Sequence, residues 1–311
     1  MTITYLKLLL TAIFWGGTFI SGRMLAESVP PFSAAFIRFF IATVCLYAIV
    51  AKREGSIPRL DKRHFLPVTL LGLTGVFAYN AFFFSGLKLV AASRASIIIA
   101  NNPIIISLLS ALFFKEKLST AKVAGIFISV SGAIIAISQG NPLALFAGGI
   151  GRGDVLIFGC VLSWASYSLL GKRVMQDLAP LTAVAHSAAI GMLALLIPAC
   201  LEGMPAALPT YSWLDWGNMA YLGWFGTVLG FVWYYEGIRA IGPSRASLFI
   251  NFVPISAICF AHVILKEPLT LSLVIGGAMV VAGVSLNHMP PTVVRQPGPK
   301  AMPKIPMKRR I

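Results

Sequence analysis

Ten stretches of about twenty mostly apolar residues follow one another along the chain, separated by short polar connections. A helix needs about 20 such residues to cross the hydrocarbon core of a bilayer. The approximate ranges are 4–22, 32–51, 65–87, 94–114, 121–139, 153–171, 181–201, 217–237, 245–265 and 271–288. The runs are too long for transmembrane strands and do not alternate with polar residues. The sequence therefore predicts an all-α integral membrane protein with ten transmembrane helices.

The composition separates this chain from soluble proteins. Hydrophobic residues make up 58% of it and charged residues only 11%, against about 25% charged in an ordinary soluble domain. The net charge of +15 does not indicate a nucleic-acid partner, because the basic residues lie in short loops and in the tail. With the N-terminus in the cytoplasm, 19 of the 25 Lys and Arg residues lie in cytoplasmic segments and five lie outside. Cytoplasmic loops carry such an excess, so we expect both termini in the cytoplasm of a bacterial cell, with the protein in the inner (plasma) membrane.

The four cysteines and the C-terminal tail indicate no cofactor chemistry. Cys45, Cys160, Cys200 and Cys259 all lie in apolar stretches, at spacings that fit neither a metal site nor a disulfide framework. We expect them to be buried small hydrophobic residues, with no metal and no cofactor. The tail, residues 289–311, is rich in Pro and Lys, and we expect it to be disordered and to rest on anionic lipid.

An internal duplication divides the chain. A shift of 151 residues maps Ser93-Arg94-Ala95-Ser96 onto Ser244-Arg245-Ala246-Ser247, and a shift of 149 maps Trp15 onto Trp164. The longer shift also pairs Pro103 with Pro254, Lys115-Glu116 with Lys266-Glu267, Gly125 with Gly276, and Gly132 with Gly283. Each repeat, 1–149 and 150–288, carries five predicted spans, so the second copy must enter the membrane from the opposite side. Inverted repeats of this kind are typical of transporters with a site near the midplane.

The duplicated pattern resembles a known family. Ala92-Ser-Arg-Ala-Ser, Asn102-Pro103, Phe114-Lys-Glu-Lys-Leu118 and the two glycines that follow, with their second copy from Pro243 to Gly283, are similar to the EamA module of the drug/metabolite transporter superfamily. The similarity covers about residues 5–287 and is greatest to bacterial amino-acid exporters, including the aromatic amino-acid type. It implies a central cavity between helices one to four and six to nine. Helices five and ten would be peripheral, and a homodimer through them is one possibility.

Pro103 and Pro254 lie in the fourth span of each repeat. Proline removes a backbone donor and clashes with the carbonyl four residues earlier. In lipid, the freed carbonyls need a protein neighbour or a wet cavity. We expect two symmetry-related kinks that line the pathway and control gating; the alternative is a pair of packing kinks.

Amide side chains occur at similar depths. Asn101 and Asn102 precede the first proline, Asn251 precedes the second, and Asn80 lies in the third span. An unpaired amide in hydrocarbon costs about 2–7 kcal/mol, so these side chains must face the bundle or water. We expect them to bind polar groups of a substrate, or else a neighbouring helix carbonyl.

Aromatic residues inside the spans are further candidates for substrate binding. Trp15 and Trp164 lie about eleven residues into their spans, which is deeper than the interfacial belt where Trp and Tyr usually gather. We expect this pair to form a cavity wall that accepts a flat or apolar solute. Tyr79, Tyr167 and Trp233 are candidates for the same wall, with belt positions as the alternative.

Three ionisable residues also lie in the spans. His186 could relay a proton, although a hydrogen-bonded structural role is the other interpretation. Arg38 and Glu236 could snorkel to the interface. Absent motifs narrow the function further: residues 4–22 contain no acid, no pair of basic residues lies mid-span, and no ATP-binding or hydrolase motif occurs.

The sequence thus favours a secondary transporter that exports neutral or zwitterionic small metabolites, such as amino acids, by alternating access. The partners would be a small-molecule substrate and the lipid bilayer. An intramembrane enzyme acting on a lipid or prenyl substrate would need clustered acids, His or Cys. A structural membrane protein would not need polar amides and broken helices at matched depths.

Overall fold

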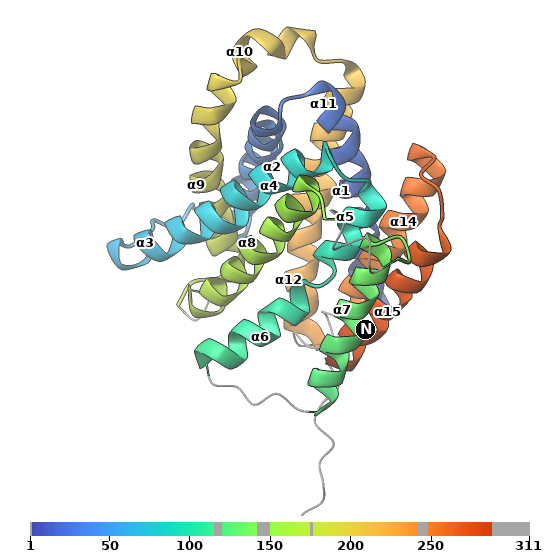
Figure 1. Ribbon diagram of the computed structural model, residues 1–311. Coiled ribbons are helices and arrows are strands. Elements are labelled where there is room, and N and C mark those ends of the chain that lie inside the picture. The colour runs from blue at the N-terminus through green and yellow to red at the C-terminus, as the bar shows by residue number, and fades with distance from the viewer. Residues whose placement is uncertain (1, 115–119, 142–149, 175–176, 242–247, 288–311) are drawn as a thin grey trace, which may run out of the picture.

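The computed structural model describes residues 2–114, 120–141, 150–174, 177–241 and 248–287 (Figure 1). All regular structure in these ranges is helical. The first half contains α1 (Thr2–Ser28), α2 (Pro31–Glu54), α3 (Lys62–Leu71), η1 (Gly72–Ala78), α4 (Tyr79–Leu87), α5 (Ala92–Ile99), α6 (Asn102–Phe114) and α7 (Thr120–Ile137). The second half contains α8 (Arg152–Val174), α9 (Pro180–Leu201), α10 (Met204–Ala207), η3 (Leu208–Thr210), α11 (Trp213–Tyr221), η4 (Leu222–Leu229), α12 (Gly230–Ile241), η5 (Leu248–Asn251), α14 (Phe252–Leu265) and α15 (Leu271–Asn287).

Helix occupies most of the described residues in each of the ten apolar ranges; turns occur at residues 100–101 and 138–139. Five helical segments are long and apolar enough to cross a membrane: Thr2–Ser28, Pro31–Glu54, Lys62–Leu87, Arg152–Gly171 and Pro180–Leu201. Shorter apolar helices cover Val123–Ile137, Phe252–Leu265 and Leu271–Leu286. The all-α class is therefore confirmed, while the ten-span, inverted-repeat arrangement stays a prediction. The predicted tail lies outside the described residues.

Two of the predicted helices contain a π-helical segment. η1 joins α3 to α4, and η4 joins α11 to α12, so each run is continuous. One other predicted helix is interrupted, and another begins with a 3₁₀ segment in its described part. The chain turns at residues 100–101 between α5 and α6, and the 3₁₀ segment η5 leads into α14. Figure 1 shows the chain changing direction between α5 and α6.

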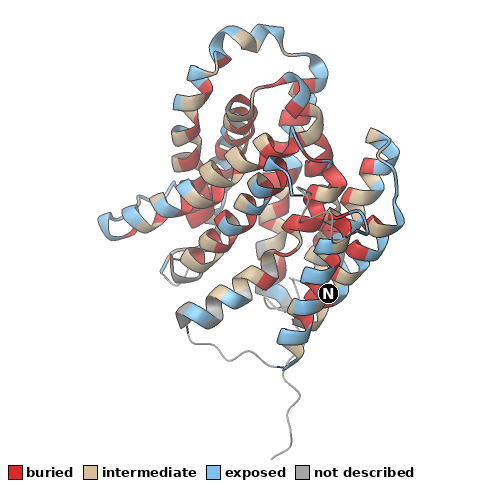
Figure 2. Ribbon diagram, in the orientation of Figure 1, coloured by how far each residue is buried: buried red, intermediate tan, exposed pale blue. Residues whose placement is uncertain are grey.

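The buried residues lie where helices face one another, and the exposed residues lie on outward faces and connections (Figure 2). Phe83, Phe84, Leu25 and Leu46 are fully buried between helices. Many outward positions are also large and apolar, for example Phe127, which is 70% exposed. Helices that are apolar on both faces suit a surrounding of lipid rather than water.

The cysteine prediction was only half correct. Cys160 is buried and Cys45 is half-buried, but Cys200 and Cys259 are exposed. Because the outward faces are themselves apolar, a small hydrophobic residue is suited to them as well as to the core.

Helices α7 and α15 pack closely through glycines (Figure 1). A Cβ added to Gly276 would lie 2.5 Å from the carbonyl oxygen of Gly132, and one added to Gly283 would lie 2.5 Å from that of Gly125. Glycine is needed here because the opposing atoms are backbone and cannot rotate away. The 151-residue shift maps Gly125 onto Gly276 and Gly132 onto Gly283, so it converts each contact into the other. The duplication is therefore repeated in the packing of these two helices.

Candidate functional site

Six aromatic side chains from four helices form a continuous series of ring contacts, which we call the aromatic row. Its members are Tyr234 and Phe231 of α12, Trp15 of α1, Trp164 and Tyr167 of α8, and Tyr79 of α4. The Phe231 ring centroid lies 6.1 Å from that of Trp15 and 6.0 Å from that of Trp164. Tyr234 extends the row at one end, 5.4 Å from Trp15, and Tyr79 at the other, 5.6 Å from Trp164. All members except Tyr167 are only partly buried.

The row brings together four residues that the sequence singled out: Trp15, Trp164, Tyr79 and Tyr167. Phe231, which joins the two tryptophans, was missed. It lies 151 residues after Asn80, so the duplication aligns it with an amide and gives no sign of its position.

Trp233 lies apart from the row. Its ring centroid is 5.7 Å from that of Phe14, and the Lys7 ammonium lies 6.0 Å from the Trp233 ring. Trp233 therefore contacts α1 through Phe14, the residue before Trp15, and also lies near the charged Lys7.

The π-helix η4 holds one end of the row in place. The Trp15 indole nitrogen donates a hydrogen bond to the Gly226 carbonyl at 2.9 Å. The Thr227 hydroxyl donates to the Leu222 carbonyl at 3.0 Å, within the same segment. A Cβ on Gly226 would lie 2.7 Å from the Thr18 methyl carbon, so glycine lets α1 approach η4 closely. Short π-helical segments are rare and often lie at functional sites.

The other π-helix, η1, makes the corresponding contact in the first repeat. A Cβ on Gly75 would lie 2.2 Å from the Tyr167 ring. The two shifts of the duplication map Gly75 onto Gly226 and Thr18 onto Tyr167. In each π-helix, therefore, a glycine packs against a side chain from the first helix of the opposite repeat. Hydropathy alone gave no indication of either segment.

Arg38 is buried, and the prediction that it snorkels to the interface was wrong. Its side chain is 8% exposed and lies between α2, α4 and η4. Nη1 donates to the Asn80 amide oxygen at 3.0 Å, and Nε donates to the Thr227 hydroxyl at 3.3 Å. Asn80 in turn donates to the Val76 carbonyl of η1 at 2.7 Å. Arg38 is held inside because these two acceptors, one from each repeat, are both buried.

Asn101 fills the break between α5 and α6. Its amide nitrogen donates to the Ile97 carbonyl at 2.9 Å, and its amide oxygen accepts from the Ser129 hydroxyl at 2.7 Å. The Ile97 carbonyl needs this donor because the backbone N–H of Asn101 bonds to Ile98 instead. Asn101 therefore makes the helix-carbonyl contact that was the alternative to substrate binding. The neighbouring Asn102 has a buried amide oxygen with no hydrogen-bond partner in the described part of the chain.

Pro103 lies in the first turn of a new helix after the break at residues 100–101, whereas Pro254 lies where the 3₁₀ segment η5 continues into α14. Pro103 is the second residue of α6, and Pro254 is the third residue of α14. Proline is tolerated in a first helical turn because its missing N–H would have no partner there. In place of the predicted kink, the chain has a break between two helices near Pro103 and a change from 3₁₀ to α-helix near Pro254. The side chain of Asn251 lies outside the described part.

His186 joins two helices and a loop. One ring nitrogen, Nδ1, lies 2.9 Å from the Tyr47 hydroxyl, and the other, Nε2, lies 3.0 Å from the Pro58 carbonyl. A carbonyl only accepts, so Nε2 carries the proton and Nδ1 accepts from Tyr47. This is the hydrogen-bonded arrangement that was the alternative to a proton relay.

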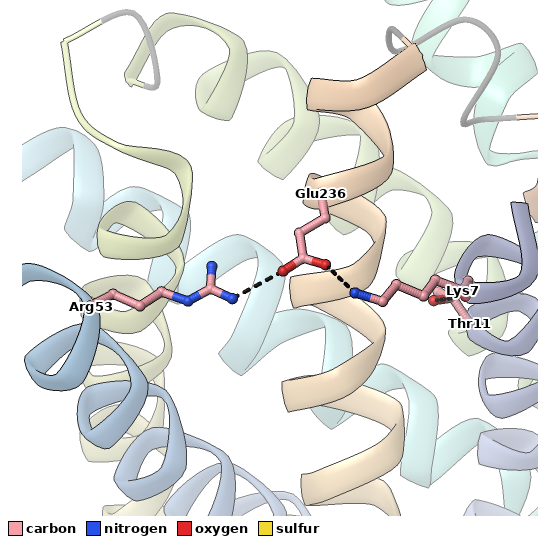
Figure 3. A network of polar contacts seen from close by, with 4 residues as sticks. All are labelled: Lys7, Thr11, Arg53 and Glu236. Atoms are coloured by element: carbon pink, nitrogen blue, oxygen red, sulfur yellow. Dashed lines mark hydrogen bonds and ion pairs between the residues drawn. The ribbon is translucent and has the colours of Figure 1, made fainter. Parts of the chain in front are cut away.

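Glu236 ties three helices together, as Figure 3 shows. Its carboxylate accepts from Lys7 of α1 at 2.8 Å and from Arg53 of α2 at 3.0 Å. Glu236 itself lies on α12, so we call these residues the α1–α2–α12 triad. One of its helices comes from the second repeat and two come from the first. Snorkelling alone would not have placed the carboxylate between two cations.

At the opposite end of the bundle, carboxylates lie at the first turns of two helices. Glu202 accepts from the backbone N–H and hydroxyl of Ser33, at 2.9 and 3.0 Å. Glu267 accepts from the backbone N–H groups of Ala92 and Ser93, at 2.8 and 3.1 Å. A negative charge at a helix N-terminus is favourable, so these contacts stabilise the starts of α2 and α5.

An ion pair lines a cavity near the start of α5. Arg94 donates to both carboxylate oxygens of Asp154 at 2.7 Å, which links α5 to α8. The cavity has a volume of about 480 Å³ and also includes Leu89 and Gln139. Within the described ranges, no three His, Cys, Asp or Glu residues gather as metal ligands would.

The EamA-like transporter family model matches residues 2–138 and 151–289, one copy in each predicted repeat. An uncharacterised transporter of Bacillus subtilis, YyaM, is 31% identical over 90% of this chain and 92% of its own length. A probable terminal-alkyne amino-acid exporter of Streptantibioticus cattleyicolor is also 31% identical, over 90% of this chain and 91% of its own.

A probable amino-acid metabolite efflux pump of Salmonella typhimurium is 26% identical, over 90% of this chain and 92% of its own. One solved crystal structure superposes with a TM-score of 0.63 at 20% identity, over 92% of this chain and 96% of that one. At this level of identity, the structural likeness supports the fold alone.

Proposed function

The chain belongs to the EamA-like transporter family, and we propose that it exports neutral or zwitterionic small metabolites by alternating access, with aromatic and apolar amino acids favoured. Two relatives whose names indicate amino-acid export support the substrate class. The protein is a multi-pass membrane protein. We place it in the inner membrane of a bacterial cell with both termini in the cytoplasm, because of the distribution of Lys and Arg.

The aromatic row is the observation that carries the proposal. Phe231 links Trp15 of the first repeat to Trp164 of the second at matched depth. A solute stacked on these rings would contact both halves, so its binding would depend on how the halves are arranged. Trp15, Phe231 and Trp164 are only partly buried, so part of each ring surface is accessible to a solute.

Matched contacts in the two repeats support alternating access. The π-helices and the glycine pairs between α7 and α15 each recur under the shift of the duplication. Two similar halves can pack in two similar ways, one open to each face of the membrane. Pro103 and Pro254 would mark the positions at which each half changes shape.

Transport into proteoliposomes tests the proposal. The panel contains amino acids, nucleobases and sugars, each measured with and without a pH gradient. We expect uptake of aromatic and large apolar amino acids, lowered in Trp15→Ala and in Trp164→Ala. Trp213→Ala is the matched control, because that side chain is 92% exposed and lies away from the row. Wild-type transport by both row variants would show that the rings serve packing alone.

A further inference from the structure

Arg38 is the only buried lysine or arginine among the described residues. Its guanidinium carries five N–H donors. Two of them are used, by Asn80 and Thr227, and both acceptors are neutral. The Nη2 end has no hydrogen-bond partner in the described part of the chain, and the guanidinium carbon lies 5.2 Å from the centroid of the Phe39 ring. A buried cation is stable only when a counter-charge or further acceptors compensate it.

The described carboxylates cannot supply that counter-charge, because each is engaged elsewhere. Their partners are Arg23 for Glu27, Thr182 for Glu54, Arg63 for Asp61, Arg94 for Asp154, His64 for Asp177, Ser33 for Glu202, Ser28 for Asp215, Lys7 for Glu236 and Ser93 for Glu267. The positive charge of Arg38 is therefore balanced by no ion pair within the described structure.

The free end of Arg38 faces the segment that also holds the aromatic row. Nη2 lies 3.9 Å from the position that a Cβ on Gly226 would take. The carbonyl of the same Gly226 accepts the Trp15 indole. At the other end of the guanidinium, Asn80 directly follows Tyr79, which belongs to the row. Arg38 and Trp15 thus both donate hydrogen bonds to η4, and Asn80 connects Arg38 to the start of α4 beside Tyr79.

We propose that Arg38 binds the carboxylate of the transported solute while the aromatic row receives its apolar part. This inference rests on the proposed function and names the anchor for one end of the substrate. The planar fork of a guanidinium matches a carboxylate, which it can bind through two parallel hydrogen bonds. One buried cation balances one negative charge, so the substrate class is a monocarboxylate with a large apolar group, such as an aromatic amino acid.

Binding to the purified protein in lipid nanodiscs tests the assignment. The probes are L-phenylalanine and L-phenylalaninamide, which differ in the carboxylate and share the ring and the amine. We expect the wild type to bind L-phenylalanine more tightly by about tenfold or more, as for a charge-assisted pair lost in the amide. In Arg38→Met this preference should disappear, through weaker binding of the acid with little change for the amide. Arg38→Lys should keep part of the preference.

Two controls keep a folding defect separate from a binding defect. Arg59→Met removes an exposed arginine from the connection after α2 and should leave both affinities unchanged. Retained affinity of Arg38→Met for the amide shows that the variant is folded. If the role of Arg38 were merely structural, Arg38→Met would lower the binding of both probes together, and that result would overturn the assignment.

The other outcomes separate the two proposals. If the wild type prefers the amide, or if Arg38→Met keeps the preference for the acid, the role of Arg38 is wrong and the transport proposal stands. If the wild type binds neither probe, then both the aromatic amino-acid substrate class and the anchoring role fail.

Discussion

Neutralising Glu236 should loosen the end of the bundle at which the α1–α2–α12 triad lies. Glu236→Gln weakens both ties of the triad, to Lys7 at 2.8 Å and to Arg53 at 3.0 Å, with little change in shape. The three side chains are 35–53% exposed, so water and salt screen the pairs. Each pair then contributes about 0.2–1 kcal/mol. The two together give about 0.4–2 kcal/mol, or a shift of about 2-fold to 30-fold between closed and open states.

Thiol labelling on α1 would measure this shift. In a background without native cysteines, Thr11→Cys places a reporter one turn from Lys7, and Ser21→Cys places a second one further along the same helix. Both positions are buried in the structure. With a membrane-impermeant maleimide, Glu236→Gln should raise the labelling rate at position 11 by about 2-fold to 30-fold and lower it at position 21.

The control is Asp61→Asn. Asp61 is also a carboxylate near an arginine, at 3.6 Å from Arg63, but both residues lie at the start of α3, so the pair joins no two helices. This variant should label like the parent. Raising the salt concentration should reduce the effect of Glu236→Gln, because partly exposed ion pairs are screened. Unchanged labelling of both reporters at low salt would refute a closing role for the triad.

Three further predictions concern topology and packing. A periplasm-dependent reporter fused after the tail should be inactive, and activity there would overturn the inverted arrangement. Pro103→Ala and Pro254→Ala should shift the two thiol reporters in opposite directions, whereas identical labelling with unchanged transport would make the breaks packing features. Gly276→Ala, whose Cβ would lie 2.5 Å from a backbone oxygen, should lower the free energy of unfolding in detergent by about 1–3 kcal/mol. Gly277→Ala, whose Cβ would meet only the ends of the Ile258 and Ile97 side chains, at 3.4 and 3.7 Å, should show no such loss.

Side-chain partners were decided by the tertiary structure. Arg38 and Glu236 both looked like residues that reach for the interface, since each is a single charge in an apolar stretch. Arg38 is instead held inside by acceptors more than forty residues away in one case and 189 residues away in the other. Asn101 and His186 were ambiguous between substrate and structure until their partners, Ser129 and Tyr47, were known. Hydrogen-bond partners from distant helices leave no trace in local sequence.

The sequence by itself determined the helical class and the duplication. Apolar runs of bilayer length fix helices because a backbone in lipid must satisfy its own hydrogen bonds. A fixed shift along the chain pairs Trp15 with Trp164. Only the tertiary structure decided that Phe231 contacts both tryptophans and that glycines of the π-helical segments pack against the opposite repeat. It also decided that a buried cation, Arg38, lies near the aromatic row. These features depend on how helices cross and rotate against one another, and helix rotation is set by packing between distant segments and not by hydropathy.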